Sequence, residues 1–416
     1  MKVAVIGAGV VGITTAYELA LQGHEVKVFE RNSSVAQECS FANAGVISPG
    51  YVTPWAKPGM AWHVLSQLGK KNAPVRISGL GLTEIAWLSK WWRACNSETF
   101  NRNRKNLLHL SLFSQQRLHE LTKRLHLNYD RSQGYVVLMR DERERKLLQA
   151  SIELMRAEGI DLKVLSTAEA LEIEPALNTA ETKLLEALYF PHDEVGNCRE
   201  FAYLLKKEAE DLGVEFELNA QVQNLLPNQA DTIRLSQQDK GQKFDAIVAC
   251  AGLASATLLK PLGIKIPLMA VHGYSISAAV REPLDAPRSG VLDERYKISI
   301  TRLGQRVRVS GSAEIGGDPK KTREQSIKTL FKVLDDWFPG AARTQENVQI
   351  WKGSRPMLPD GPPLVGSSGV KGIWLNLGHG SSGWALACGS AKAIADMVSQ
   401  HKTEIDMQGF DYQRLK

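Results

Sequence analysis

The apolar and polar positions among the first thirty residues predict a strand, a helix and a second strand. Lys2–Ile6 is a short apolar run typical of a buried strand, and the apolar-rich segment 10–22 that follows predicts a helix. Gly23 stands where helices commonly end, and residues 24–29 alternate as a half-buried strand does. The pattern therefore predicts a strand–helix–strand unit.

The hydrophobic pattern of the remaining residues predicts both helices and strands. Helices are predicted at about 83–127, 141–158, 198–212 and 321–337, and strands at 134–139, 185–190, 214–218, 244–252 and 372–377. Alternating runs at short intervals between 266 and 314 are typical of an antiparallel sheet. The segment 351–366 contains four prolines and is predicted to be rigid and irregular.

The turn between the first strand and helix has the glycine spacing of a dinucleotide-binding motif. Gly7 permits the tight turn, Gly9 lets the backbone approach a pyrophosphate, and Gly12 lets the helix pack close to the strand. The N–H groups that open the helix would bind phosphates. Glu30 ends the second strand at the spacing of a carboxylate that accepts hydrogen bonds from ribose, which disfavours a 2′-phosphate. NAD or FAD is therefore expected rather than NADP.

A second glycine-rich turn, residues 378–383, opens a helix that starts at Trp384. A single NAD would hardly need it, whereas an extended FAD can place its pyrophosphate at the first helix and its flavin at the second. A positive helix end there would stabilise the anionic reduced flavin. Small residues at 39–50 fit cofactor contact better than a plain linker, and the strand 244–252 ends in small residues directed back to the cofactor. FAD is thus favoured, with an NAD-dependent dehydrogenase as an alternative.

The amino-acid composition limits which classes of protein the chain can belong to. A chain of 416 residues with 43% hydrophobic and 23% charged residues fits a globular enzyme of two domains. Its five cysteines are scattered without a CxxC pair, so neither a metal site nor a disulfide framework is expected. No secretory signal precedes the first strand, and no stretch of 18 apolar residues predicts a transmembrane helix.

The positive charge is concentrated between residues 55 and 107. Nine cations and two anions give this segment a charge of +7, against +6 for the whole chain, and it holds five of the nine tryptophans. The cations are Lys57, Lys70, Lys71, Arg76, Lys90, Arg93, Arg102, Arg104 and Lys105. The tryptophans either fill a substrate domain beneath a solvated charged face, or form a membrane-surface patch. No nucleic-acid recognition motif accompanies them, so no nucleic acid partner is expected.

Three narrower motifs carry a family resemblance. Residues 43–51 (NAGVISPGY) with 54–56 (PWA), 292–298 (LDERYKI) and 378–380 (GHG) resemble D-amino acid dehydrogenase small subunits. These belong to the superfamily of glycine, sarcosine and D-amino acid oxidases, and the similarity spans nearly the whole chain. The resemblance implies an α/β fold with a Rossmann-like FAD-binding domain assembled from discontinuous segments, 1–60, 193–257 and 350–416. An α+β substrate-binding domain with a mixed or antiparallel sheet would comprise 61–192 and 258–349.

The resemblance also implies a reaction. D-Amino acids would be deaminated oxidatively to 2-oxo acids and ammonia by hydride transfer from the α-carbon to flavin N5. Electrons would pass to a quinone or another respiratory acceptor. An oxygen-using amine oxidase of the glycine/sarcosine type and a non-catalytic FAD-binding subunit remain alternatives. Covalent-flavin relatives carry a cysteine near the proline-rich segment, and 352–356 has none, so non-covalent FAD is expected. The expected location is the cytoplasm or, peripherally, the cytoplasmic face of the bacterial inner membrane.

Candidate site residues follow from the motifs and the resemblance. Arg355 matches the family arginine that binds the substrate carboxylate, a task that suits the two parallel hydrogen bonds of a guanidinium; the alternative is a surface arginine. Tyr296, Tyr274 and Tyr51 are candidates for the substrate pocket, and Tyr296 is also a catalytic candidate. His379 is either a general base or a residue that shapes the flavin site. The candidate cofactor-binding residues are Gly7, Gly9, Val10, Val11, Gly12, Glu30, Arg31, Ser40, Asn43, Ala44, Gly45, Val46, Val222, Ala251, Gly252, Gly378, Gly380, Ser381, Ser382 and Gly383.

Overall fold

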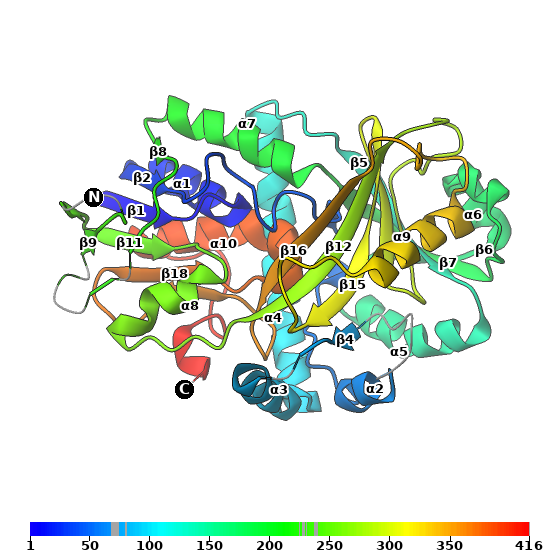
Figure 1. The fold of residues 1–416 in the computed structure, drawn as a ribbon, viewed down its shortest axis with the longest axis horizontal. Helices are drawn as coiled ribbons and strands as arrows, with labels where there is room; N and C mark the ends of the chain where they lie inside the picture. Colours follow the sequence, from blue (N-terminus) through cyan, green and yellow to red (C-terminus); the bar gives the residue numbers. More distant parts are fainter. Residues whose placement is uncertain are drawn as a thin grey trace.

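Two large sheets lie beside each other in the computed structural model (Figure 1). It describes residues 1–67, 75–79, 81–223, 225–226, 229, 231–236 and 240–415. Lys70 and Lys71 of the basic segment lie outside these residues. The predicted α/β class, with a parallel nucleotide-type sheet and a mixed second sheet, is confirmed.

The first sheet has six strands in the described part of the chain, in the order β17-β18-β11-β1-β2-β8. Their bounds are β1 (Lys2–Ile6), β2 (Glu25–Phe29), β8 (Glu215–Glu217), β11 (Ala246–Ala249), β17 (Leu364–Ser367) and β18 (Ile373–Leu377). All neighbours run parallel except β17 and β18. One core joins this sheet to α1 (Val10–Leu21), α7 (Cys198–Asp211), α10 (Gly383–Val398) and the long α4 (Ser97–Arg124).

The predicted strand–helix–strand unit is confirmed, and its glycine turn is as tight as the motif requires. Gly7 has a φ of 103°, in the region that favours glycine. A Cβ at Gly12 would overlap the carbonyl oxygen of Gly7. The missing side chain therefore allows α1 to start directly against the end of β1.

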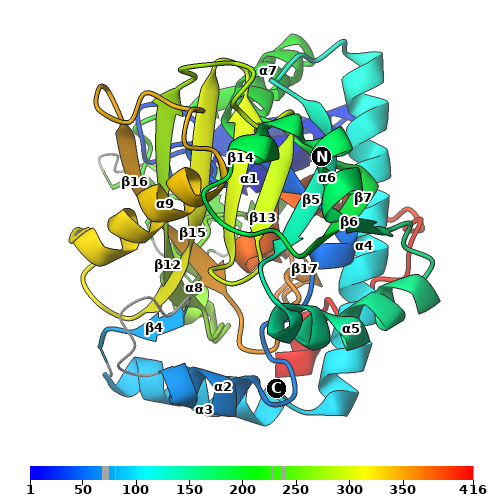
Figure 2. The same ribbon diagram turned by 90° about the vertical axis from the view of Figure 1, so that its right-hand side faces the viewer.

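The second sheet has ten described strands, with the path β16-β12-β15-β14-β13-β5-β7-β3 and with β4 and β6 attached to β15 and β7. The bounds are β3 (Val46–Ile47), β4 (Val75–Ile77), β5 (Ser132–Met139), β6 (Lys163–Ser166), β7 (Glu186–Val195), β12 (Met269–Ala279), β13 (Gly290–Asp293), β14 (Ile298–Leu303), β15 (Arg306–Ile315) and β16 (Gln349–Met357). Most pairs are antiparallel, but β5 runs parallel to β13 and β4 runs parallel to β15. One face packs on α9 (Glu324–Trp337) and the other contacts α5 (Glu142–Ala157) (Figure 2).

The remaining elements are short. The helices are α2 (Met60–Gln67), α3 (Leu82–Ala94), α6 (Thr167–Ile173) and α8 (Ala254–Leu259), and β9 (Thr232–Ile233) and β10 (Gln242–Lys243) form a separate hairpin. Single 3-10 turns occur at Pro49–Tyr51, Pro175–Thr179, Lys260–Leu262, Gly380–Ser382 and Tyr412–Leu415. Across the described ranges, no helix combines the length and apolar character that a bilayer crossing needs.

Three sequence predictions were wrong in detail. The helix predicted at 83–127 is broken into α3 and α4, because the Asn96 side chain accepts from Thr99 N and caps α4. The strand predicted to stop before Pro191 continues to Val195, since a bulge opposite 133–135 removes that position from the ladder. The segment predicted to be irregular begins as β16, where Pro356 is tolerated because β16 is an edge strand.

Several elements also cross the predicted domain boundaries. β3 and β16 belong to the second sheet, although 1–60 and 350–416 were assigned to the FAD-binding domain. α4 packs in the core of α1 and α10, although 61–192 was assigned to the substrate-binding domain. Segments 1–60 and 350–416 thus contribute strands to both sheets, and the exact boundaries stay a prediction.

Candidate functional site

A cavity of about 510 Å³ is lined by residues of both sheets. The first sheet contributes the carboxyl ends of β1, β2, β11 and β18, which is where open α/β sheets bind ligands. The second sheet contributes residues of β12, β14, β15 and β16. Because it spans both sheets, the cavity is suited to holding an elongated ligand at one end and a smaller molecule at the other.

The end of the cavity at the first glycine turn is built for a dinucleotide. Glu30 accepts a hydrogen bond from Ala8 N on one carboxylate oxygen (2.8 Å) and from Asn32 N on the other (2.9 Å). This fixes the carboxylate while leaving lone pairs for the hydroxyls of a ligand. Val10 donates the first N–H of α1 to Ser40 Oγ (3.0 Å). The other N–H groups in the first turn of a helix have no acceptor within the helix and can therefore bind a ligand.

The second glycine turn closes the other end of the same cavity. Gly378 and Gly380 have φ values of 79° and 57°, and a Cβ at Gly380 would overlap the Met357 sulfur. Trp384 at the start of α10 donates its indole N–H to the Gly45 carbonyl (3.2 Å). This bond ties the small-residue loop to α10, so the loop and the helix enclose the middle of the cavity.

Polar atoms of the cavity wall fit a polar cofactor. Asn376 Oδ1, Ser310 Oγ and Trp351 Nε1 are buried, line the cavity and have no hydrogen-bond partner among the described residues. Buried polar atoms are usually paired, and unpaired ones at a cavity wall are suited to ligand atoms. A cofactor with polar edges such as FAD matches this wall.

Arg355 projects into the cavity from β16. Its Nη1 donates to the Ser312 carbonyl (2.9 Å), and a Cβ at Gly273 of the neighbouring β12 would overlap its guanidinium. Burial lowers the pKa of Arg355, and no carboxylate in the described part of the chain forms an ion pair with it. A partly buried guanidinium at a cavity wall without an anionic partner is suited to an anionic ligand group.

Comparisons with known proteins agree with this geometry. The model of the FAD dependent oxidoreductase family (DAO) matches residues 2–397. The chain belongs to this family. It is 40% identical to a D-amino acid dehydrogenase of Rhizobium rhizogenes over 98% of both chains, and 37% identical to one of Bradyrhizobium diazoefficiens over its full length and 99% of that protein. Among solved structures, glycine oxidase from Geobacillus kaustophilus has a TM-score of 0.76 at 20% identity, covering 99% of this chain and 98% of that one.

The chain is therefore an FAD-dependent oxidoreductase, and the predicted resemblance to D-amino acid dehydrogenases is confirmed. Most of the predicted cofactor-binding residues line the cavity, whereas Gly12 and Ser382 do not. Gly12 acts through the packing of α1 described above. The residues in the wall are Gly7, Gly9, Val10, Val11, Glu30, Arg31, Ser40, Asn43, Ala44, Gly45, Val46, Val222, Ala251, Gly252, Gly378, Gly380, Ser381 and Gly383. Their contacts with FAD stay a prediction.

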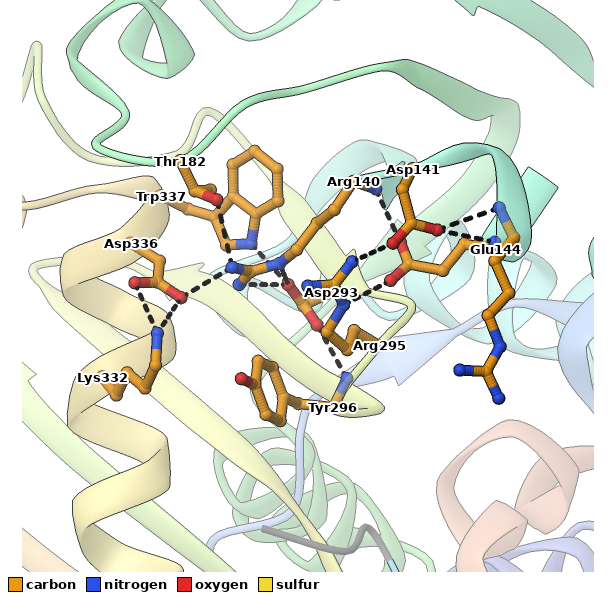
Figure 3. Close-up of polar contacts among 11 residues, drawn as sticks. Arg140, Asp141, Glu144, Thr182, Asp293, Arg295, Tyr296, Lys332, Asp336 and Trp337 are labelled. Carbon is orange, nitrogen blue, oxygen red and sulfur yellow. Dashed lines mark hydrogen bonds and ion pairs between the residues drawn. The ribbon is translucent and has the colours of Figure 1, made fainter. Parts of the chain in front are cut away.

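The tyrosines predicted for the substrate pocket have different positions. Tyr274 lines the cavity, and its hydroxyl donates to Glu314. Tyr51 does not line the cavity; it is partly buried, with its ring edge-to-face against Tyr135 and Phe190. Tyr296 also lies outside the cavity wall, beneath the Arg140 guanidinium at 5.3 Å from its ring centroid (Figure 3). The placements predicted for Tyr51 and Tyr296 are therefore not supported.

Tyr296 and Lys297 end the turn between β13 and β14, and their side chains lie on opposite sides of the sheet. Side chains of even-numbered residues here, such as Ile298 and Ile300, pack in the core beneath α9, and Tyr296 packs against the same core. Lys297 and Ser299 have the opposite parity and line the cavity. The alternation of polar and apolar residues in 296–301 carried this signal, and the sequence reasoning missed Lys297 and Ser299.

His379 lines the cavity, and its Nε2 lies 3.0 Å from Ser390 Oγ inside α10. Burial lowers the pKa of His379 to about 3, so the ring is neutral and weakly basic. This favours a role in shaping the site over that of a general base.

Cys39, also missed from sequence, lines the wall beside Arg355 and donates its thiol hydrogen to the Ser354 carbonyl (2.7 Å). Burial raises the pKa of Cys39 to about 11, which keeps it a thiol.

Proposed function

We propose that the chain oxidises the α-amine of D-amino acids, giving an imine that water hydrolyses to a 2-oxo acid and ammonia. The observation that carries this proposal is Arg355, a partly buried cation without a carboxylate partner among the described residues, at the wall of the cavity shared by both sheets. The family membership and the full-length similarity to D-amino acid dehydrogenases support it.

The protein's own part in this reaction is to bind and orient the substrate. When bound, FAD supplies the acceptor for the hydride that leaves the α-carbon. Arg355 binds the substrate carboxylate, and its bond to the Ser312 carbonyl fixes the direction of the guanidinium. Tyr274 is part of the cavity wall on β12, while its side chain packs in the core beneath α9 with its hydroxyl bonded to Glu314, which holds this part of β12 in place. The result is one orientation of the α-carbon relative to the cofactor.

FAD is proposed to be bound without a covalent link. The two cavity-lining cysteines, Cys39 and Cys250, are held as thiols, because burial raises their pKa values to about 11 and about 12. A thiol is a poorer nucleophile than a thiolate. Acid precipitation of the purified protein should therefore leave the flavin in the supernatant, and flavin in the pellet would contradict this part of the proposal.

The substrate class is tested by anaerobic reduction. FAD-loaded protein is mixed with the D- and L-forms of a set of amino acids, and the loss of flavin absorbance is followed. Bleaching by D-forms only supports the proposal. Bleaching by L-forms only, or by no amino acid, would overturn it. Reoxidation by a soluble quinone should outpace reoxidation by dissolved oxygen; the reverse would favour the oxygen-using amine oxidase.

We further propose that α2 and α3 attach the protein to the cytoplasmic face of the inner membrane, where a quinone is available as acceptor. These two helices lie at the lower edge of the molecule in Figures 1 and 2. Their outer side exposes Trp62 (69%), Leu82 (88%) and Ile85, and the ring of Trp92 packs edge-to-face on Trp62 at 5.5 Å. A group of exposed apolar side chains of this kind favours a lipid interface.

Cations and packing support this orientation of the two helices. Lys90 and Arg93 are exposed on α3, where they would attract anionic lipid. Trp87 and Trp91, by contrast, are buried against β12, β15 and β16, so they fill a core as the alternative interpretation expected. The inner side of α3 thus packs on the strands that carry Arg355 and its neighbours, while the outer side is left for the membrane.

Liposome sedimentation tests the attachment. Wild type should sediment with anionic liposomes at low salt, and Trp62→Ala/Trp92→Ala and Lys90→Glu/Arg93→Glu should weaken this binding. Leu284→Ala is the matched control, because Leu284 is 84% exposed outside α2 and α3. High salt should weaken the electrostatic part. Wild type that stays in the supernatant, or double variants that sediment as it does, would contradict binding through this surface.

A further inference from the structure

A buried polar cluster adjoins the part of the cavity wall that β14 provides. Ser299 lines the cavity, and its Oγ lies 3.0 Å from Tyr135 Oη on β5. The Tyr135 side chain spans the intervening strand β13 at Gly290, where a Cβ would lie 3.0 Å from its ring. A hydroxyl pair therefore leads from the cavity into the protein.

Two unpaired polar atoms continue from this hydroxyl pair. Tyr51 Oη and Glu294 Oε2 are buried and have no hydrogen-bond partner in the described part of the chain. The Tyr51 ring packs edge-to-face on Tyr135 at 6.5 Å. Glu294 directly follows Asp293, which pairs with Ile298 beside Ser299, so these groups gather at one end of the β13–β14 pair. Unpaired polar atoms in such a region are positions that buried water bridges.

Glu294 connects this enclosed region to the solvent. Its other carboxylate oxygen is paired with Lys297 Nζ. The Lys297 side chain is 51% exposed and also lines the cavity, so it lies at the cavity mouth. The polar cluster therefore has one end at the interior wall, at Ser299, and the other in water, at Lys297.

The turn that carries Glu294 and Lys297 is fixed by a buried network, drawn in Figure 3. Asp293 is fully buried and accepts hydrogen bonds from Arg140 (2.7 Å), the Trp337 indole (2.7 Å) and Tyr296 N (2.8 Å). Arg140 also pairs with Asp336 at 2.8 Å. Since Asp293 points to the α9 side, its neighbour Glu294 points to the cavity side.

The proposed amine oxidation must release a proton from this enclosed site. We propose that Ser299, Tyr135 and Glu294 form a proton exit path from the substrate amine to Lys297 at the solvent. The path rests on the function proposed above. An N–H bond of the substrate ammonium breaks and its proton passes to Ser299, while hydroxyl protons move on through Tyr135 to Glu294. The C–H electron pair leaves as hydride to FAD, the C=N bond forms, and Glu294 gives the proton to water beside the Lys297 ammonium.

The electrostatic surroundings fit a carboxylate that takes up and releases a proton. Burial raises the pKa of Glu294, and the Lys297 charge opposes this rise. Burial also raises the pKa of the nearby Asp193 to about 7, although the hydrogen bond from Ser48 acts to lower it. The charged or titratable groups that act on Glu294 or respond to it are Lys57, Tyr51, Tyr135, Glu144, Asp293 and Lys297.

Anaerobic stopped-flow reduction across a pH series tests the path in FAD-loaded Tyr135→Phe and Glu294→Gln. Below the pKa of the amine, the substrate arrives as an ammonium, so both variants should bleach at least about 10-fold more slowly than wild type. The difference should shrink as the pH is raised, because the amine then arrives neutral. Added imidazole, a small diffusible base, should restore part of the lost rate.

Tyr189→Phe is the matched control, since Tyr189 lies on the neighbouring β7 and packs in the core beneath α9. FAD content and melting temperature establish that each variant is folded. Wild-type rates in both path variants would overturn the path, as would a loss of rate that is equal at every pH and unchanged by imidazole. Wild type that no D-amino acid bleaches would overturn the proposed function together with the path.

Discussion

The two walls of the cavity are made in different ways. The first sheet contributes mainly backbone and small residues, such as Gly7, Gly9 and Gly378, with Glu30 held by backbone N–H groups. The second sheet contributes side chains, above all Arg355 and Lys297, whose positions depend on neighbouring strands and buried polar contacts. A wall made of backbone atoms tolerates few substitutions that change its shape. A wall made of side chains can be altered by substituting one residue at a time.

The largest effect is expected where the side-chain wall is anchored. Arg140→Met leaves Asp293 as a buried charge without its cationic partner. Removing one partner of a buried pair costs about 3–5 kcal/mol, so the free energy of unfolding should fall by this amount. Urea unfolding measures it. Arg143→Met, an exposed change in the first turn of α5, is the control, and equal stability of the two variants would contradict the role of the network.

The next effect concerns substrate binding alone. Arg355→Ala should lower kcat/KM for D-amino acids by about 10- to 150-fold, because a hydrogen bond to a charged group contributes about 1.5–3 kcal/mol. Arg355→Lys should restore the charge but only part of the orientation. Steady-state kinetics at equal FAD content check both. Near-normal kinetics in Arg355→Ala would remove this residue from the substrate site.

A pair of glycine variants probes the backbone wall. Gly12→Ala introduces an overlap with the Gly7 carbonyl, and overpacking of this kind costs about 1–3 kcal/mol, so both the melting temperature and the FAD content should fall. Gly9→Ala places its Cβ 3.5 Å from Ser40 Oγ, which is ordinary contact. It should leave the apoprotein stable and weaken FAD binding only. Equal FAD content in wild type and Gly9→Ala would contradict a cofactor at this turn.

The smallest effect at neutral pH is expected for His379→Gln. Burial holds the folded-state pKa of His379 at about 3, below the ordinary 6.5, so the contribution to stability is present above pH 6.5 and is lost as the pH falls towards 3. The variant should therefore weaken the acid dependence of the unfolding free energy in this range. The pH dependence of the flavin reduction rate should show no contribution from the His379 side chain between pH 5 and 8. A titration that disappears in the variant would restore His379 as a base.

The contrast between the two cavity walls also explains which parts of the site could be predicted from the sequence and which could not. The strand–helix–strand unit and Glu30 follow from local spacing, because Gly7, Gly9 and Glu30 are close in sequence. Arg355 was predicted from the family resemblance and lines the cavity, whereas Tyr296 does not, because the β13–β14 turn directs Lys297 rather than Tyr296 to the cavity. The path through Tyr135 and Glu294 was missed, since it joins β5 to the β13–β14 turn. No local pattern reports that pairing, although the parity of 296–301 could have located Lys297 and Ser299.

The most direct test of the account compares a D-amino acid with its amide in wild type and Arg355→Ala. Both compounds offer the same amine and α-hydrogen, but only the acid offers a carboxylate to the guanidinium. The rate of anaerobic flavin reduction per unit concentration should favour the acid in wild type. Arg355→Ala should lose that preference by about 10- to 150-fold while oxidising the amide as wild type does. A variant that keeps the full preference for the acid would contradict the account.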